Sequence, residues 1–191
     1  MRCYICSTFS FSVVCKKCEK NLFISKMHYK TVGTLDVISF FSYSHIASLL
    51  HTKHKPEGYR VYKYLAKKTV QPFIEEFIES DNRIIYVVGV DEYARGGYSH
   101  VALLTHAMKT KYSEPLHGTL MAQNRVNYSG KDLDFRMNNP RDFNYMGKKD
   151  IDVILVDDII TTGITLQEAQ KVLMKNGVNV LFALTLAEVE M

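Results

Sequence analysis

The sequence predicts a mixed α/β fold built on a largely parallel β-sheet, and the pattern of apolar runs is the main reason. Residues 84–90 and 153–156 are apolar runs rich in β-branched residues, as expected for strands that are buried on both faces. A third strand is expected at 179–186. Helical patterns follow the first two strands, and strands that alternate with helices are typical of a parallel sheet. A binding site is then expected at the carboxyl ends of the strands.

The stretch that follows the strand at 153–156 carries most of the functional signal. Asp157 and Asp158 are expected where this strand emerges, and a turn of two threonines and a glycine follows at 161–163. Apolar residues then recur at helical spacing, so a helix is expected to begin after the turn. Thr165 and Glu168 are predicted to cap that helix, since the pair has the spacing of a capping box.

The residue types in this stretch suit a ribose 5-phosphate. The start of a helix has unpaired backbone N–H groups and the positive end of the helix dipole, so it attracts an anion. Asp157 and Asp158 are candidate catalytic residues, because carboxylates at this position can accept hydrogen bonds from ribose hydroxyls and can lie near a bound Mg²⁺. An acidic turn before a capped helix that binds nothing is the alternative interpretation. The candidate phosphate-binding residues are Ile160, Thr161, Thr162, Gly163, Ile164 and Thr165.

Composition and charge narrow the class of protein. The 191-residue chain is 47% hydrophobic and 23% charged, which is typical of a soluble globular protein. No apolar run has the length of a membrane span and the N-terminus lacks signal-peptide features, so a cytoplasmic protein that does not cross a membrane is expected. Residues 1–70 hold twelve Lys and Arg against three acidic residues, a net charge of +9, whereas the remainder carries −5. This asymmetry favours a polyanionic partner for the N-terminal part, and a solvated basic face is the alternative.

All four cysteines lie near the N-terminus, in the pattern Cys3-x₂-Cys6-x₈-Cys15-x₂-Cys18. Two Cys-x₂-Cys pairs separated by a short loop can arrange four thiolates tetrahedrally around one ion. Four sulfur ligands favour Zn²⁺, which can hold a segment too small to have its own core, and a disulfide scaffold is disfavoured in the cytoplasm. We therefore predict a structural zinc ribbon at residues 1–26, since four protein ligands leave no open position for catalysis.

Residues 27–80 predict a β-hairpin followed by helices. Alternating residues on either side of Gly33-Thr34 favour a hairpin over 27–43. A short helix is expected to end near residue 53. A longer helix over 61–78 is expected to kink or break at Pro72, because proline cannot continue the backbone hydrogen bonds.

Basic residues and tyrosines alternate in and between these helices, which is typical of a platform for single-stranded nucleic acid. Phe9 and Phe11, in the loop between the cysteine pairs, can stack on bases in the same way. The alternative is that the aromatic residues pack against the core while the lysines face water. The candidate nucleic-acid-binding residues are Lys16, Lys17, Lys53, Lys55, Arg60, Lys63 and Lys67.

Two loops are further candidate parts of the ligand site. Tyr93 and Arg95 follow the strand at 84–90, where paired glycines let amides point inward and an arginine can bind phosphate bidentately. A plain glycine turn is the alternative there. The polar stretch 112–149 lacks periodicity and is expected to be a long loop, which could form a lid. Its candidate ligand contacts are Arg125, Tyr128 and Arg136.

The run from 153 to 165 resembles the phosphoribosyl-pyrophosphate motif of type I phosphoribosyltransferases, an apolar strand followed by Asp-Asp, two variable residues and Thr-Thr-Gly. The whole chain resembles the ComF family, which is associated with competence and DNA uptake. The parallels are the four-cysteine ribbon, the basic middle segment, the Arg-Gly residues at 95–98 and the Arg-x-x-Asn pattern at 136–139. The chain departs from the ComF pattern at 90–92, where a proline-containing loop is common, and at 98–100, where Tyr-Ser-His replaces aromatic-Asn-Gln.

The resemblance implies a type I phosphoribosyltransferase-like core at 81–191, preceded by a zinc ribbon at 1–26 and a basic hairpin and helical segment at 27–80. It implies phosphoribosyl pyrophosphate (PRPP) with Mg²⁺ as the ligand and single-stranded DNA as a partner, in a cytoplasmic protein of natural transformation. The DNA-uptake machinery at the inner membrane is a further candidate partner. A conventional Mg²⁺-dependent phosphoribosyltransferase of nucleobase or nucleotide metabolism is the alternative, and a ligand-gated regulator is a third interpretation. The sequence leaves open whether a base is transferred.

Overall fold

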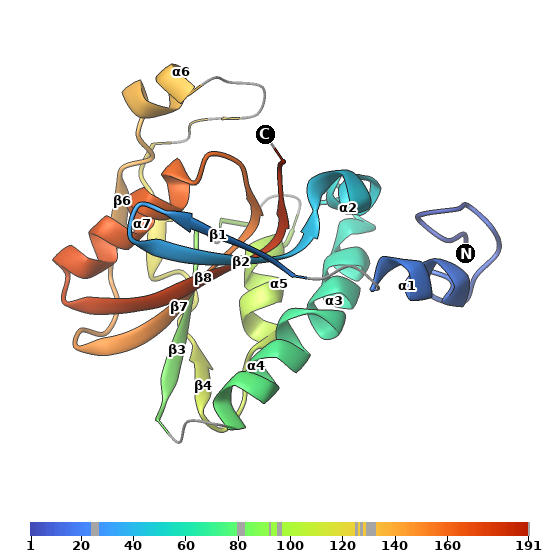
Figure 1. Cartoon of the computed structure of the whole chain (residues 1–191), viewed down its shortest axis with the longest axis horizontal. Coiled ribbons are helices and arrows are strands. Elements are labelled where there is room, and N and C mark those ends of the chain that lie inside the picture. The colour runs from blue at the N-terminus through green and yellow to red at the C-terminus, as the bar shows by residue number, and fades with distance from the viewer. Residues whose placement is uncertain are drawn as a thin grey trace.

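The computed structural model describes residues 1–23, 27–79, 83–91, 93–94, 97–124, 126, 128 and 133–190. Its strands are β1 (His28–Val32), β2 (Leu35–Ser42), β3 (Ile85–Gly89), β4 (Ser113–Pro115), β5 (Leu120–Ala122), β6 (Phe143–Tyr145), β7 (Ile151–Ile160) and β8 (Val178–Glu188). Its helices are α1 (Lys16–Leu22), α2 (Tyr43–Leu50), α3 (Gly58–Lys68), α4 (Val70–Glu79), α5 (His100–Ala107), α6 (Leu133–Asn138) and α7 (Ile164–Lys175). Figure 1 shows a central sheet with α7 on one side and α3, α4 and α5 on the other.

Within the described residues, six strands form one sheet in the order β1-β2-β8-β7-β3-β4. Neighbouring strands from β2 to β4 pair in parallel, and β1 pairs with β2 in antiparallel fashion. β5 and β6 form a separate antiparallel pair. The mixed α/β fold with a mostly parallel sheet, predicted from the sequence, is therefore confirmed.

The central strand β7 is buried on both faces, which explains its apolar sequence. Ile154 and Val156 belong to the core shared with α2, α3, α4 and α5, whereas Val153 and Leu155 belong to the core shared with α7. All four are fully buried. Successive side chains of a strand point to opposite faces, so one short run contributes to both cores.

The predicted hairpin and the predicted helix break are both present. β1 and β2 form the hairpin, and β2 then pairs with β8, with Val37 opposite Ala183. The hairpin therefore extends the sheet, which the sequence did not indicate. The helical stretch breaks at Thr69, between α3 and α4, and Pro72 lies in the first turn of α4, where its missing N–H is not needed.

The N-terminal segment packs against the helical side of the sheet. Its buried side chains Cys3, Val14 and Leu22 belong to the same cluster as Phe41 and Ile46. The described N-terminal chain lies beside α1, at the far end of the molecule from α6 and α7 (Figure 1). None of the described helices has the length and apolar character needed to cross a membrane.

Two local expectations differ from the structure. β7 continues to Ile160, which pairs with Glu188 of β8, so the two aspartates lie inside the strand rather than after it. The capping-box prediction is wrong: Gly163 precedes α7, and no side chain caps this helix. Glu168 instead accepts the backbone N–H groups of Arg141, at 3.1 Å, and Asp142, at 2.6 Å. Its carboxylate thereby binds the backbone at residues 141–142 and not the start of its own helix.

The stretch 112–149 contains more regular structure than a long loop. It holds β4, β5, α6 and β6, and Leu120, Phe143 and Tyr145 are buried in the core that also contains α7. Strands of three residues are too short to produce a recognisable alternation, which is why the sequence did not predict them.

Candidate functional site

A cavity of about 770 Å³ lies at the carboxyl ends of β3, β7 and β8. Val90 and Asp91 reach it after β3, Asp157 from the last part of β7, and Val189 after β8. This is the edge of the sheet where the sequence predicted a site. The wall that comes from α2 and the turn after it consists of Tyr43, Leu50, His51, Lys53 and His54.

The structure brings part of the predicted ligand-binding set together. The members that line the cavity are Asp157, Asp158, Thr161, Thr165 and Tyr93. Four members of the predicted phosphate-binding run are not among the lining residues: Ile160, Thr162, Gly163 and Ile164. Ile160 is instead buried in the core that α7 covers, and the Thr162 hydroxyl is buried without a hydrogen-bond partner among the described residues. Arg95 lies outside the described residues.

Gly163 sets the bend that leads from β7 into α7. Its φ of 82° is in the left-handed region, which favours glycine. A Cβ at this position would lie 2.6 Å from Cγ1 of Val32 in β1, so the hairpin also requires a glycine here. The amino end of α7, whose first N–H groups have no partner within the helix, is thereby placed beside Thr161 and Thr165.

Asp158 is the most heavily engaged residue of the cavity. Its Oδ2 atom accepts hydrogen bonds from Lys53 Nζ at 3.1 Å and from the Tyr62 hydroxyl at 3.2 Å, and it lies 3.3 Å from His100 Nε2. Burial opposes the charge on this carboxyl, but His100 and Lys53 outweigh it and hold the pKa of Asp158 well below its usual range. Burial and the charge of Asp158 raise the pKa of Tyr62, so this hydroxyl stays protonated and donates.

Asp157 behaves in the opposite way. It is half-buried, and its Oδ1 atom accepts the backbone N–H of Asp158 at 2.8 Å. Burial, followed by the negative charge of Asp158, raises the pKa of Asp157 to about 8. The two neighbouring carboxyls therefore differ strongly in their tendency to ionise, as is common in functional sites.

Two arginines and a tyrosine line another part of the cavity. Arg136 of α6 donates to the Thr161 hydroxyl and, at 3.0 Å, to the backbone oxygen of Tyr128. Arg141 donates to Asp91 at 3.3 Å, and both guanidinium groups lie over the Tyr128 ring, with their carbons 5.6 Å and 4.9 Å from its centroid. Arg136, predicted as a lid contact, thus contacts the turn at 161–163, and Tyr128, the other described lid candidate, lies beside Arg136. Arg125 is outside the described residues.

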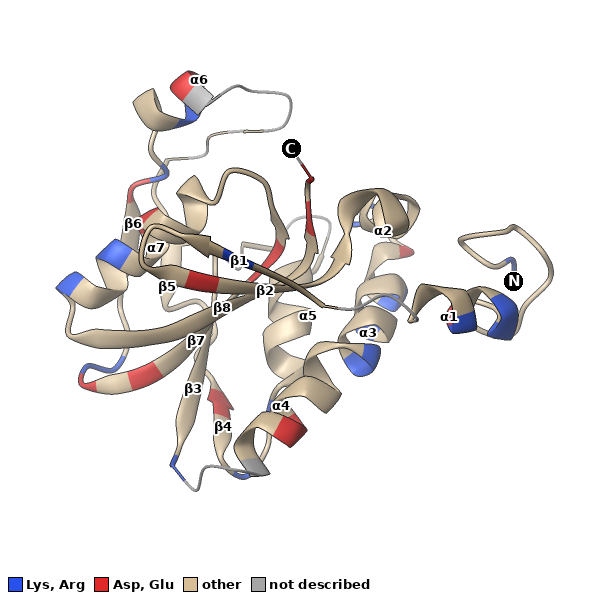
Figure 2. Ribbon diagram, viewed as in Figure 1, with Lys and Arg blue, Asp and Glu red and all other residues tan. Residues whose placement is uncertain are grey.

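The candidate nucleic-acid residues separate into two groups. Lys53 lines the cavity and pairs with Asp158, whereas the other six are exposed: Lys16, Lys17, Lys55, Arg60, Lys63 and Lys67. Basic residues recur along α1 and α3 in Figure 2. Lys63 Nζ lies 5.9 Å from the centroid of the Tyr59 ring, and Phe9 and Phe11 are 72% and 93% exposed. These side chains are accessible to a large partner.

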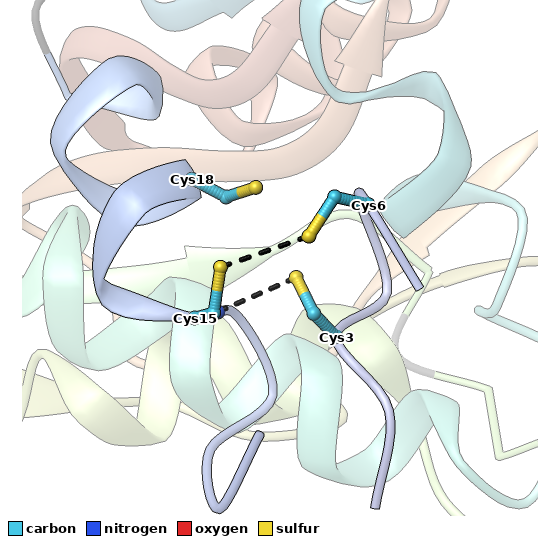
Figure 3. Close-up of side chains that lie close together, drawn as sticks. All are labelled: Cys3, Cys6, Cys15 and Cys18. Atoms are coloured by element: carbon cyan, nitrogen blue, oxygen red, sulfur yellow. Dashed lines mark hydrogen bonds between the residues drawn. The ribbon is translucent and has the colours of Figure 1, made fainter. Parts of the chain in front are cut away.

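The four cysteines converge on one point. Their Sγ atoms all lie within 4.8 Å of one another, and Figure 3 shows them pointing inward from two stretches of chain. The Sγ atoms of Cys6 and Cys15 are 3.7 Å apart. A tetrahedral zinc site with Zn–S bonds of about 2.3 Å requires sulfur–sulfur distances of about 3.8 Å. The donor set and its spacing therefore fit Zn²⁺.

The protonation of the thiols is uneven. Hydrogen bonds with the Thr8 side chain and backbone lower the pKa of Cys6 to about 6, whereas the contact with Cys6 raises the pKa of Cys18 to about 12. The backbone N–H of Cys15 also donates to Cys3 Sγ at 3.3 Å. Four thiolates at this distance repel one another, and a divalent cation would remove that repulsion.

Several cavity residues had no predicted role. They are Tyr43, His51, His54, Asp91, His100 and Arg141. Tyr62 is buried behind the cavity and reaches it only through its hydrogen bond to Asp158. His54 lies between Lys53 and Lys55 in the basic run, and His100 ends the Tyr98-Ser99-His100 segment. These two stretches were the available signals in the sequence. Which of these side chains meets Asp158 depends on how α3 and α5 pack, and a single sequence does not indicate that.

Solved structures of phosphoribosyltransferases are similar to this chain. An adenine phosphoribosyltransferase has a TM-score of 0.46 and 17% identity, covering 91% of this chain and 90% of its own. A hypoxanthine phosphoribosyltransferase from Staphylococcus aureus has a TM-score of 0.40 and 17% identity, covering 73% and 70%. An orotate phosphoribosyltransferase from Aeropyrum pernix has a TM-score of 0.38 and 18% identity, covering 89% and 77%.

No protein-family model matches the chain, and no curated protein matches it. The structural likeness is too distant to say what the chain binds. What defines the class of this protein is its own architecture, a mostly parallel α/β sheet with a cavity at its carboxyl edge and an N-terminal cluster of four cysteines.

Proposed function

We propose that the cavity binds a ribose 5-phosphate-type ligand, with PRPP as the leading candidate. The observation that carries this proposal is the placement of Asp157, Thr161 and Thr165 around one cavity, at the junction of β7 and α7. The N–H groups at the start of α7 and the threonine hydroxyls would bind the phosphate, and Asp157 would accept a hydrogen bond from a sugar hydroxyl.

Other residues would bind the remaining parts of PRPP. Arg136 already donates to Thr161, so its guanidinium lies within reach of a phosphate held at this turn. Tyr93 and Arg95, in the loop after β3, would contact the pyrophosphate. Ile160, Thr162, Gly163 and Ile164 would act through the backbone of the turn, since the cavity does not expose their side chains.

The cavity also fits Mg²⁺ bound together with PRPP. Magnesium prefers oxygen ligands and is commonly held by one or two carboxylates plus substrate phosphates. Asp157 offers a half-buried carboxylate on the cavity wall. Bound there, the ion would neutralise negative charge on the pyrophosphate.

Calorimetric titration tests the ligand. PRPP with Mg²⁺ and ribose 5-phosphate are expected to bind, and ribose without phosphate is expected to bind at least roughly tenfold more weakly, because it lacks the charge-assisted hydrogen bonds. Thr165→Val should weaken binding of both phosphorylated ligands, whereas Thr34→Val, an exposed threonine of the hairpin turn, should not. Equal affinity for ribose and ribose 5-phosphate would refute a phosphate subsite.

We further propose that the cysteine cluster binds structural Zn²⁺ and that the chain comprises a zinc ribbon at 1–26, a basic segment at 27–80 and a phosphoribosyltransferase-like domain at 81–191. The four converging thiols support the metal site. One equivalent of zinc per chain, measured by elemental analysis of protein purified without added metal, is the expected result. A protein that keeps its cysteines reduced but binds no zinc would contradict it.

For the biological role we propose a ComF-type protein that handles single-stranded DNA in the cytoplasm, in contact with the DNA-uptake machinery. The exposed basic and aromatic residues of α1, α3 and the cysteine loop support a DNA surface. Affinity for an oligonucleotide should fall steeply with salt, and Lys63→Ala with Lys67→Ala should lower the salt slope by about 1–2. A flat salt dependence would contradict the proposal.

The alternative, a conventional phosphoribosyltransferase of nucleobase metabolism, makes a different prediction. Pyrophosphate should then be released from PRPP in the presence of one member of a nucleobase panel. PRPP binding without release across the panel would favour the ComF-type role.

A further inference from the structure

Strand β1 of the hairpin packs against the turn that joins β7 to α7. Val32 contacts this turn at Gly163, where an added Cβ would lie 2.6 Å from its Cγ1 atom. Lys30 contacts it at Thr161, whose backbone oxygen accepts a hydrogen bond from Lys30 Nζ at 3.5 Å. Alternate residues of a strand share a face, and both side chains are half-buried while the residue between them is exposed. Neither residue lines the cavity, so β1 supports the turn from outside it.

The positive charge of Lys30 has no carboxylate partner among the described residues. Two acidic side chains contact β1, and other residues engage both of them. Asp36 Oδ1 accepts a hydrogen bond from the Thr31 hydroxyl at 2.7 Å, and Glu188 Oε1 lies 3.4 Å from His28 Nδ1. Burying part of an ammonium group without a counter-ion is unfavourable. The position of this lysine therefore favours an anion bound at the turn.

The contact with Lys30 also orients the peptide group between Thr161 and Thr162. This peptide bond is trans, so its C=O and N–H groups point in opposite directions. Because Lys30 holds the carbonyl oxygen on the hairpin side, the N–H of Thr162 points away from the hairpin. Within the described part of the chain, this N–H donates to no hydrogen-bond acceptor. It is a backbone donor that an anion at the start of α7 could use.

We infer that Lys30 is a positioning residue of the phosphate subsite: it holds the Thr161 carbonyl toward the hairpin, turns the Thr162 N–H toward the phosphate, and adds positive charge behind the turn. This inference rests on the proposed function and deepens it, because it adds a residue of the hairpin to a subsite built by β7 and α7. The ligand class is a phosphate monoester, whose charge of about −2 gains more from a nearby ammonium than a singly charged group does.

Calorimetric titration with ribose 5-phosphate, ribose 5-sulfate and ribose tests the role of the charge. Lys30→Met should weaken ribose 5-phosphate binding roughly three- to tenfold, because a positive charge near the phosphate is lost. The singly charged sulfate ester should lose less, and the affinity for ribose should stay within about twofold. Lys30→Arg keeps the charge and a donor, so it should bind ribose 5-phosphate within about threefold of the wild type.

A matched control removes the same charge at the other end of α7. Lys175 is an exposed residue of the last turn of this helix. Lys175→Met should leave the affinities for all three ligands unchanged, because the charge that it removes does not contact the turn.

The backbone amide of Thr162 gives a second readout, with inorganic phosphate as the probe. In the wild type, phosphate should shift the amide resonance of Thr162 in NMR spectra. At saturating phosphate this shift should be smaller in Lys30→Met, because the peptide group is no longer held. Resonances from β3 and β8 should be the same in both proteins without phosphate, which checks that the variant is folded.

Three outcomes would overturn the inference. Unchanged affinity of Lys30→Met for ribose 5-phosphate would show that the charge does not contribute. Equal weakening of all three ligands would show that Lys30 only supports the fold. A Thr162 resonance that does not respond to phosphate in the wild type would show that its N–H does not face the anion. Each of these, with ribose 5-phosphate still bound by the wild type, refutes the role of Lys30 alone, whereas no binding to the wild type refutes the proposed function as well.

Discussion

The cavity at the carboxyl edge of the sheet and the cysteine cluster differ in what holds them together. Most cavity residues come from β7, α2, α5 and the segments that follow α2, β3 and β8, and two hydrophobic cores hold these strands and helices in place without a ligand. Residues 1–23 bury few apolar side chains, namely Cys3, Val14 and Leu22, and expose Phe9 and Phe11. The cavity is therefore preformed by the fold, whereas the cysteine segment would depend on cross-linking by the proposed zinc ion.

Removing a cysteine gives the largest expected effect and tests this contrast directly. Cys6→Ser should reduce zinc binding from one equivalent to none. The effect on the segment should be large, because binding energies of about 10 kcal/mol or more are typical of structural zinc in small peptides. Hydrogen exchange should show loss of protection in residues 1–23 and retention in β3, β7 and β8. Lys20→Ala, an exposed change in the same segment, is the control. Simultaneous loss of protection in the sheet would show that the two regions fold as one unit.

A glycine substitution tests the preformed side of the comparison. Gly163→Ala should destabilise the protein by about 2–4 kcal/mol in urea denaturation, because it combines backbone strain with overpacking against Val32. Zinc content should not change. In the Gly163→Ala/Val32→Ala double variant, the destabilisation caused by the clash with Val32 should disappear. The remaining loss of stability should be about 1 kcal/mol from backbone strain at 163, plus the cost of the smaller side chain at 32. A double variant as unstable as the sum of both singles would contradict the proposed clash.

The pH dependence of stability should reveal Asp157. Its pKa is raised in the folded protein, so the native state holds this proton more tightly than the unfolded chain. Stability should consequently decrease as the pH rises from about 4 to about 8, relative to Asp157→Asn, by about 1–2 kcal/mol for a partly exposed group. Asp158, whose pKa is lowered, contributes stability that is lost only in acid. Identical profiles for the wild type and Asp157→Asn would contradict the raised pKa.

The smallest expected effect concerns the ion pair that joins the two regions. Lys68 of α3 lies 2.5 Å from Glu19 of α1, and this contact holds the pKa of Glu19 below its usual value. Both side chains are partly exposed, so Glu19→Gln should cost no more than about 1 kcal/mol, and less at high salt. Melting curves at low and high salt measure it. Glu114→Gln, which removes an exposed pair with Lys148 elsewhere, is the matched comparison.

Much of the core fold could be predicted because its signals are local. The apolar runs that became β3, β7 and β8, the hairpin and the break near Pro72 each follow from residues that are close in sequence. The short strands of the 112–149 stretch and the pairing of β2 with β8 could not, because they depend on contacts between distant segments.

The sequence by itself determined which chemical groups are present: four cysteines at metal-binding spacing, an acidic pair after a run of apolar residues, and a threonine-glycine turn before a helix. Only the tertiary structure decided how they are used. It turned the Oδ2 atom of Asp158 toward Lys53, Tyr62 and His100, whereas Asp157 beside it accepts a backbone N–H. The physical reason is that the ionisation and availability of a buried carboxyl depend on neighbours in space, and these three neighbours come from a turn and two helices up to 105 residues away in the chain.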